Sequence, residues 1–191
     1  MKKGSWDEAV ARLRGLLPLL KEHDEAKDIQ QSKKAVLERY QPIFSLPAVK
    51  YLKEDDFTSF LDFENNRHWT GLARKKGFIL KEFDKLRGTL GLLVDEEQPL
   101  IERLDIIYED KRYKVTGLGR AVITAILTVV FPDRYGVWNG KSERGMKKLG
   151  IFPEFDRGES FGGRYAKFNR VLHLLKDELG LDLWTLDILW H

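Results

Sequence analysis

The sequence predicts an all-α fold on three observations. Apolar residues recur at spacings of three and four through most of the 191-residue chain, which is the period of amphipathic helices. The one segment that could form a small β-hairpin, IIYEDKRYKV at 106–115, is better explained as a helix end followed by a loop. No internal repeat, low-complexity tract or linker interrupts the chain. We therefore expect one compact helical unit.

Two helices are expected at the start of the chain, over residues 6–23 and 24–40. An apolar stripe at helical spacing defines the first of them: Val10, Leu13, Leu16, Leu17 and Leu20. Pro18 lies inside this stripe and should kink or split the helix, because proline cannot donate the backbone hydrogen bond. Gln41-Pro42 should end the second helix, since a residue before proline disfavours the helical conformation.

The remaining helices are predicted, in chain order, over residues 45–52, 57–63, 81–93, 97–107, 118–131, 140–149 and 164–179. Asp55 or Asp56 should cap the helix at 57–63, and Pro99 should lie in the first turn of the helix at 97–107. Residues 64–77 and the glycine-rich residues 157–163 lack periodicity and are predicted as loops. The tail contributes Leu183, Trp184, Leu186, Leu189 and Trp190 to the core.

Length and composition narrow the class of protein. Residues 1–44 are expected to form an N-terminal helical extension on a main domain at 45–191. The chain has no cysteine, which excludes disulfides and thiolate metal sites, and its four histidines are scattered, so we expect no metal and no cofactor. No apolar run is long enough to cross a membrane and no signal peptide is visible, so a cytoplasmic protein is expected.

Positive charge is concentrated in one segment. Residues 110–170 carry 13 Lys and Arg against 6 Asp and Glu, an excess of seven. Because the whole chain carries only +3, the remaining residues have a net charge of −4. This asymmetry is typical of a surface that faces a polyanion, although solvated helix faces would give the same count.

A glycine pair, Gly117-Leu118-Gly119, stands directly before an apolar helix. Two glycines allow a tight turn and a close approach of the backbone to another molecule, while Leu118 turns inward. The first N–H groups of the helix then point outward at the positive end of its dipole, where a phosphate is the natural partner. Arg120 would add a charge to the same phosphate or its neighbour.

A second set of basic residues, on the helix at 140–149, would also meet a DNA backbone. These are Lys141, Arg144 and Lys148. Their spacing places most of the basic side chains of this helix on one side, as phosphate binding requires, but a solvated helix face explains them equally well.

The residues of this region carry a resemblance. VTGLGRAVITAIL is similar to a helix-hairpin-helix motif, and the stretch up to VWNGKSERGMKKLG, residues 115–150, resembles the helix-hairpin-helix DNA glycosylase superfamily. The resemblance implies a glycosylase-like helical bundle. It places the essential aspartate of the family at Asn139, and the lysine of its lyase members at Ala121. Neither residue can do that chemistry, so no catalytic residue is predicted.

A loop in the middle of the chain could read a base. Arg67, His68 and Trp69 stand together there, and with Trp138 and Asn139 they could stack on and hydrogen-bond a flipped nucleotide. The adjacent Arg74, Lys75 and Lys76 could contact its backbone. Alternatively Trp69 lies in the core of an internally hydrogen-bonded loop, and Asn139 does no more than cap a helix.

Three phrases together resemble a DNA-recognition domain found with McrB-type restriction ATPases: FTSFLDFENNRHWTGL, GLGRAVITAILTVVFPDRYGVWN and LDLWTLDILW. The resemblance implies that a separately encoded nuclease or ATPase is a partner. The chain itself has no GxxxxGK[ST] loop and therefore no such ATPase site.

We therefore expect a domain that binds double-stranded DNA and senses a flipped or modified base, in restriction or repair. Two alternatives remain open. One is a monofunctional DNA glycosylase that uses Asn139, Glu64 or Asp62 to position water. The other is a protein-interaction module whose exposed apolar patch is formed by the tail tryptophans.

Overall fold

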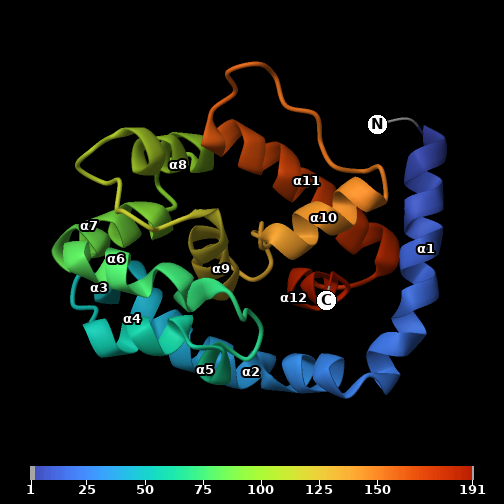
Figure 1. The fold of residues 1–191 in the computed structure, drawn as a ribbon, viewed down its shortest axis with the longest axis horizontal. Coiled ribbons are helices and arrows are strands. Elements are labelled where there is room, and N and C mark those ends of the chain that lie inside the picture. Colours follow the sequence, from blue (N-terminus) through green and yellow to red (C-terminus); the bar gives the residue numbers. More distant parts are fainter. Residues whose placement is uncertain (1–2, 191) are drawn as a thin grey trace.

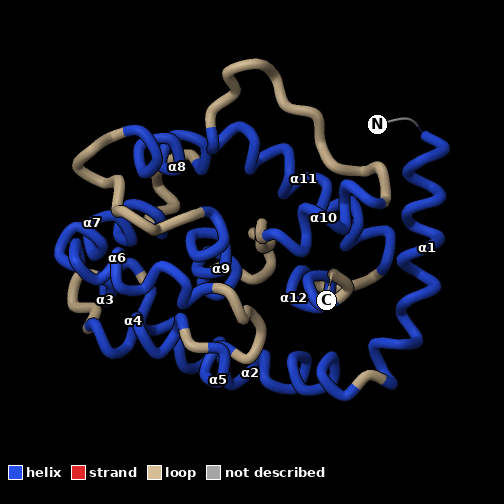
Figure 2. The backbone as a smooth tube through the Cα atoms, in the orientation of Figure 1, coloured by secondary structure: helices blue, strands red, loops and turns tan. Residues whose placement is uncertain are grey.

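The computed structural model describes residues 3–190, and they contain helices and loops but no strand (Figures 1 and 2). The all-α prediction is confirmed. The helices are α1 (Lys3–Glu22), α2 (Asp24–Phe44), α3 (Leu46–Val49), α4 (Glu54–Leu61), α5 (Phe63–Asn66), α6 (Lys76–Ile79), α7 (Phe83–Val94), α8 (Leu100–Glu109), α9 (Arg120–Val130), α10 (Gly140–Lys148), α11 (Phe161–Leu179) and α12 (Leu183–Ile188). Two short 3₁₀ helices, η1 (Leu72–Lys75) and η2 (Leu80–Glu82), flank α6.

Helix α9 lies at the centre of the molecule, and every residue from Val122 to Val129 is buried. Figure 1 shows α3–α8 on one side of it, α10–α12 and α1 on the other, and α2 running along the base of both. Helix α2 packs against α9 and α12, and α8 packs against α11. Residues from α1 and α2, among them Leu13 and Phe44, belong to the same hydrophobic core as the residues after 45.

Neither Pro18 nor Pro42 ends its helix. Helix α1 continues through Pro18, and α2 continues past Pro42 to Phe44. The prediction for α2 was wrong because it weighed the missing N–H of Pro42 alone. Tyr40 and Phe44 are both completely buried and stand four residues apart on one helix face, so packing offsets the lost hydrogen bond.

The predicted caps of α4 were also wrong. The helix begins at Glu54, and Asp55 and Asp56 lie in its first turn, where their charges complement the helix dipole. The segment predicted as a continuous loop at 64–77 is partly helical, because α5 covers its start and η1 with α6 its end. Residues 106–115 form the end of α8 followed by turns. This agrees with the sequence prediction of a helix end and a loop in place of a β-hairpin.

The glycine-rich loop predicted at 157–163 is shorter than expected, because α11 begins at Phe161. Ser160 caps the helix by accepting a hydrogen bond from Gly163 N–H. Gly162 then allows α11 to approach α8 closely, since a Cβ at this position would lie 2.4 Å from the carbonyl oxygen of Ile101. Gly162 N–H also donates to Asp105 Oδ1 at 2.7 Å.

We expect Gly162→Ala to lower the free energy of unfolding by about 1–3 kcal/mol, because the methyl group would force α8 and α11 apart. Gly88→Ala is the matched control, since no atom lies within 4 Å of its Cβ position in α7. It should raise stability by about 0.5–1 kcal/mol through helix propensity alone. Urea denaturation measures both, and equal effects of the two substitutions would contradict the close contact.

Candidate functional site

A pocket of about 230 Å³ opens between the loop before η1 and the start of α10. It is lined by His68, Trp69, Thr70, Gly71, Leu72, Arg74, Ala121, Val137, Asn139, Gly140, Lys141 and Arg144. The two segments that the sequence singled out for base recognition therefore meet at one pocket. Ala121 and Asn139, the positions of the family lysine and aspartate in the resemblance, both line it.

One buried asparagine holds the loop that carries His68 and Trp69. The side-chain oxygen of Asn66 accepts hydrogen bonds from His68 N–H at 2.9 Å and from Trp69 N–H at 2.7 Å. Its amide nitrogen donates to the carbonyls of Phe60 and Trp69. The loop is therefore internally hydrogen-bonded and Trp69 is buried, yet both His68 and Trp69 form part of the pocket wall.

A buried carboxylate stands behind this wall. Asp187, which is 3 % exposed, accepts a hydrogen bond from Trp69 Nε1 at 2.9 Å, and His68 Nε2 lies 2.9 Å from the same oxygen. The Trp184 ring packs edge-on against both aromatic rings. This group of side chains orients the wall, and its carboxylate does not line the pocket.

Asn139 caps α10. Its Oδ1 accepts hydrogen bonds from Lys141 N–H at 2.7 Å and Ser142 N–H at 3.0 Å, and its own N–H donates to Ser142 Oγ at 3.0 Å. This is a complete capping box. The structural role considered for Asn139 is therefore present, and its Nδ2 group has no acceptor among the described residues.

Side chains of α9 and α11 hold the extended segment before α10 in place through hydrogen bonds. Trp138 N–H donates to Thr124 Oγ1 of α9 at 2.9 Å, and Gly136 N–H donates to Asn169 Oδ1 of α11 at 2.9 Å. A Cβ on Gly136 would lie 2.4 Å from a methyl group of Leu172, so the segment packs directly on α11. These contacts fix where Asn139 lies.

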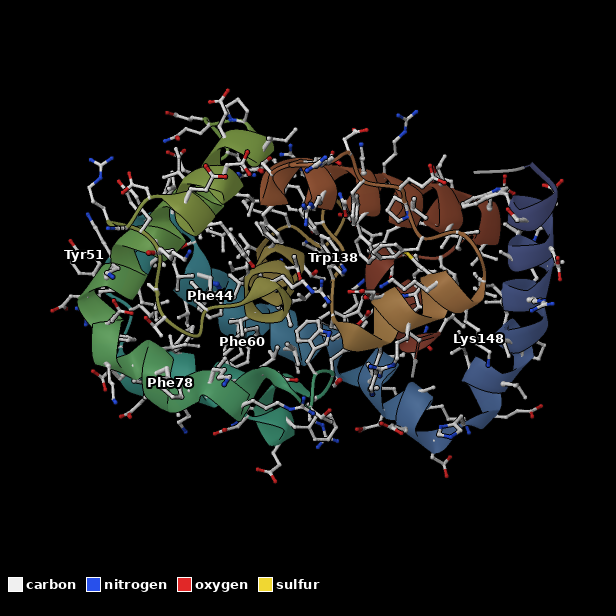
Figure 3. The ribbon with its side chains drawn as sticks, turned by 45° about the horizontal axis from the view of Figure 1, so that its top comes forward. Phe44, Tyr51, Phe60, Phe78, Trp138 and Lys148 are labelled. Atoms are coloured by element: carbon white, nitrogen blue, oxygen red, sulfur yellow. The ribbon has the colours of Figure 1, made fainter. Side chains whose placement is uncertain are left out.

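Trp138 does not line the pocket, which corrects the prediction that it could stack on a base. It is 3 % exposed, and its ring stacks on Phe168 with centroids 4.8 Å apart. The Arg120 guanidinium lies over the ring at 4.7 Å. Figure 3 shows Trp138 inside the molecule, close to α9. Its aromatic surface is already used by the core.

Arg67 also lies outside the pocket lining, against the prediction. Its backbone is left-handed, with a φ of 58°, because it ends α5. From there its guanidinium reaches Asp28 of α2 and binds both carboxylate oxygens, at 2.5 and 2.7 Å. Arg67 therefore links the loop to α2.

The glycine turn packs on η1 and α6. Gly117 has a φ of +87°, and a Cβ there would lie 3.1 Å from Lys75 Cβ and 3.2 Å from Phe78 Cβ. Both conformation and space therefore require glycine at this position. Leu118 is buried, and nothing lies within 4 Å of the Cβ position of Gly119.

The N–H groups of this turn are only partly engaged. Thr116 N–H donates to Glu82 Oε2 at 2.7 Å, and Leu118 N–H donates to the Val115 carbonyl at 3.2 Å. No acceptor within residues 3–190 receives the N–H groups of Gly117, Gly119, Arg120 or Ala121. Glu82 thus covers the start of the glycine turn. The N–H groups in the first turn of helix α9 stay available to an anion.

An open groove of about 640 Å³ runs beside the turn. It is lined by Lys75, Glu82, Lys85, Ile107, Tyr108, Lys111, Lys114, Val115, Thr116, Gly117, Leu118 and Gly119. Four lysines and one glutamate contribute to it, so the groove carries a net positive charge. Lys85 forms an ion pair with that glutamate, Glu82.

The predicted backbone-binding residues divide into three groups. Gly117, Leu118 and Gly119 line the groove, whereas Lys141 and Arg144 line the pocket. Arg120 and Lys148 line neither. Arg120 is paired with Glu143, and Figure 3 shows Lys148 toward the far end of α10.

Glu143 neutralises part of the positive charge of this region, because its carboxylate forms ion pairs with both Arg120 and Lys147. Burial acts to raise the pKa of its carboxyl, but hydrogen bonds and charges from Lys147 and Arg120 outweigh burial and hold the pKa below its ordinary value. The charge excess counted along the sequence is therefore partly neutralised at the surface.

No carboxylate lines the pocket. Asp62 lies 4.0 Å from Lys76 Nζ and Glu64 is exposed, so neither supplies the acid that was considered for a glycosylase. Among the described residues no three His, Asp or Glu side chains gather to bind a metal ion.

Trp184 is fully buried and Trp190 packs on Gly145, so these tryptophans do not form the exposed patch of an interaction module.

Comparison with protein-family models, with curated proteins and with solved structures found no match to this chain. Within residues 3–190, no helix has both the length and the apolar character needed to cross a bilayer.

We expect Asn139→Ala to lower the free energy of unfolding by about 1 kcal/mol, because two N–H groups of α10 lose their acceptor. Asn139→Asp should keep full stability, since a carboxylate caps equally well and its charge suits the helix N-terminus. Thermal denaturation of the two variants tests the capping box, and an Asn139→Ala protein as stable as the parent would contradict it.

The Glu82 contact should make the glycine turn sensitive to acid. Hydrogen bonds from Lys85 and from Thr116 lower the pKa of Glu82 from 4.5 to about 2. Because the folded pKa lies below the unfolded one, this contribution to stability is complete above pH 4.5 and is lost as the pH falls through about 2.

Glu82→Gln should therefore be less stable than the parent at neutral pH, and the difference should shrink between pH 4.5 and 2. Chemical denaturation at several pH values measures this difference. Glu97→Gln, at an exposed position outside the turn, serves as the control. A Glu82→Gln deficit that stays constant with pH would show that the carboxylate charge is not involved.

Proposed function

We propose that this chain is a non-catalytic domain that binds double-stranded DNA and receives an extrahelical base in the pocket. One observation carries the proposal: the pocket and the lysine-lined groove meet along two stretches of chain. Arg74 lines the pocket and its neighbour Lys75 lines the groove, while Ala121 lines the pocket and Gly119 the groove. A base in the pocket would thus have its sugar-phosphate strand beside the groove.

The groove suits a phosphate backbone on physical grounds. Available N–H groups at the start of a buried helix, together with several lysines, bind phosphate without reading sequence. Lysine contacts release counterions from DNA, which makes the affinity strongly dependent on salt. Glu82 opposes this attraction locally, but Lys85 pairs with it and the groove remains cationic.

The pocket composition favours recognition over cleavage. A glycosylase has to stabilise positive charge on the departing sugar and direct a water, for which it uses a carboxylate. The pocket instead presents two arginines, a lysine and Asn139. We therefore propose that residues 115–150 form a glycosylase-like helix-hairpin-helix scaffold. This scaffold captures a base but lacks the catalytic groups.

A domain that only senses a base requires a separate effector. The resemblance to the recognition domains of restriction ATPases fits this arrangement. On this proposal, a separately encoded nuclease or ATPase acts after the domain has bound modified or extrahelical DNA.

The test uses two isosteric substitutions at Gly119, which is the N-cap position of α9 and has open space at its Cβ. Asparagine and aspartate both cap helices, so both variants should fold with stability at least equal to the parent. Only Gly119→Asp also puts a negative charge beside the available N–H groups.

We expect Gly119→Asp to weaken duplex DNA binding by at least about tenfold and to lower the salt slope by about one, whereas Gly119→Asn should have a smaller effect. Fluorescence anisotropy with a labelled duplex at several salt concentrations measures both quantities. Lys34→Ala on α2, where Lys34 pairs with Glu38, controls for simple loss of positive charge. The proposal fails if the parent does not bind duplex DNA at low salt, or if an abasic product forms.

A further inference from the structure

Asn139, Arg74 and Arg144 present hydrogen-bond donors to the pocket, and no carboxylate lines it. Asn139 Oδ1 is already bound to two N–H groups of α10, which leaves its Nδ2 donor for a ligand. The Asp187 carboxylate, which lies nearby, faces Trp69 and His68 behind the wall. A ligand in the pocket therefore meets the Nδ2 donor of Asn139 and does not meet the Asp187 carboxylate.

Three backbone carbonyls of lining residues accept hydrogen bonds from within the protein. The carbonyl of Val137 accepts from Ser142 Oγ at 3.0 Å, and that of Trp69 accepts from Asn66 Nδ2 at 3.3 Å. The Asn139 carbonyl accepts from Glu143 N–H at 3.1 Å. These three carbonyls are thus engaged within the protein.

Two arginines add forked donors to the lining. Within the described part of the chain, no carboxylate forms an ion pair with Arg74 or Arg144. Arg144 extends back over the start of its own helix, with Nη1 3.2 Å from the Cβ position of Gly140. Guanidinium groups pair best with two acceptors that lie side by side.

We infer that the pocket selects an extrahelical base whose exposed edge carries carbonyl oxygens, such as guanine or thymine, over adenine and cytosine. The inference rests on the proposed function. Guanine offers adjacent O6 and N7 acceptors, and thymine offers O4, whereas adenine and cytosine place amino donors on the same edge. An amino group facing Arg74, Arg144 and Asn139 Nδ2 would leave donors on both sides without acceptors.

The experiment compares one fully paired duplex with four duplexes that carry a single unpaired G, T, A or C in the same sequence. The protein should bind the G and T bulges on the order of tenfold more tightly than the A and C bulges. Arg144→Lys and Arg74→Lys keep the charge but lose the fork, so each should reduce this preference while binding of the paired duplex changes little. Arg170→Lys, on the exposed face of α11, is the matched control.

The outcomes separate the two proposals. Binding of the paired duplex with equal affinity for all four bulges, or with A and C preferred, overturns the selection and leaves DNA binding intact. Absence of binding to every duplex overturns the proposed function, and the selection falls with it. If both Arg→Lys variants keep the full preference for G and T bulges, Arg74 and Arg144 are not the donors that select the base.

Discussion

The burial of α9 from Val122 to Val129 is the constraint on which the rest of this molecule depends. A helix whose residues from Val122 to Val129 are all inside the core cannot shift or rotate without disturbing packing on every side. Its N-terminal turn, by contrast, reaches the surface, so rigid N–H groups are presented at a fixed point. The pocket and the groove both adjoin this point, and their relative positions follow from it.

The sequence predicted the all-α class and the approximate extent of most helices, because apolar spacing reflects burial directly. Its errors occurred where a local signal opposed packing. Pro42 indicated the end of a helix, but the buried Phe44 keeps the chain helical. Glycines at 162 and 163 indicated a loop, but Gly162 is the residue that lets two helices touch.

The candidate site was predictable to a similar degree. The segments around Trp69 and Asn139 could be singled out by residue type, and the structure places both at one pocket. Trp138 and Arg67 could not be assigned from sequence, because a tryptophan beside a helix cap and an arginine in a loop give no indication of their partners. Those partners, Phe168 and Asp28, are distant along the chain. Glu82 and Asp187 were missed for the same reason.

The hydrogen bond between Trp69 and Asp187 joins residues 118 positions apart. Asp187 belongs to α12, so the wall of the pocket is completed only when α12 has docked behind the loop that carries Trp69. Contacts of such long range form late, since the intervening chain has to be ordered first. Docking of α12 and completion of this wall are therefore coupled, and any change that loosens α12 also disturbs the side of the pocket formed by His68 and Trp69.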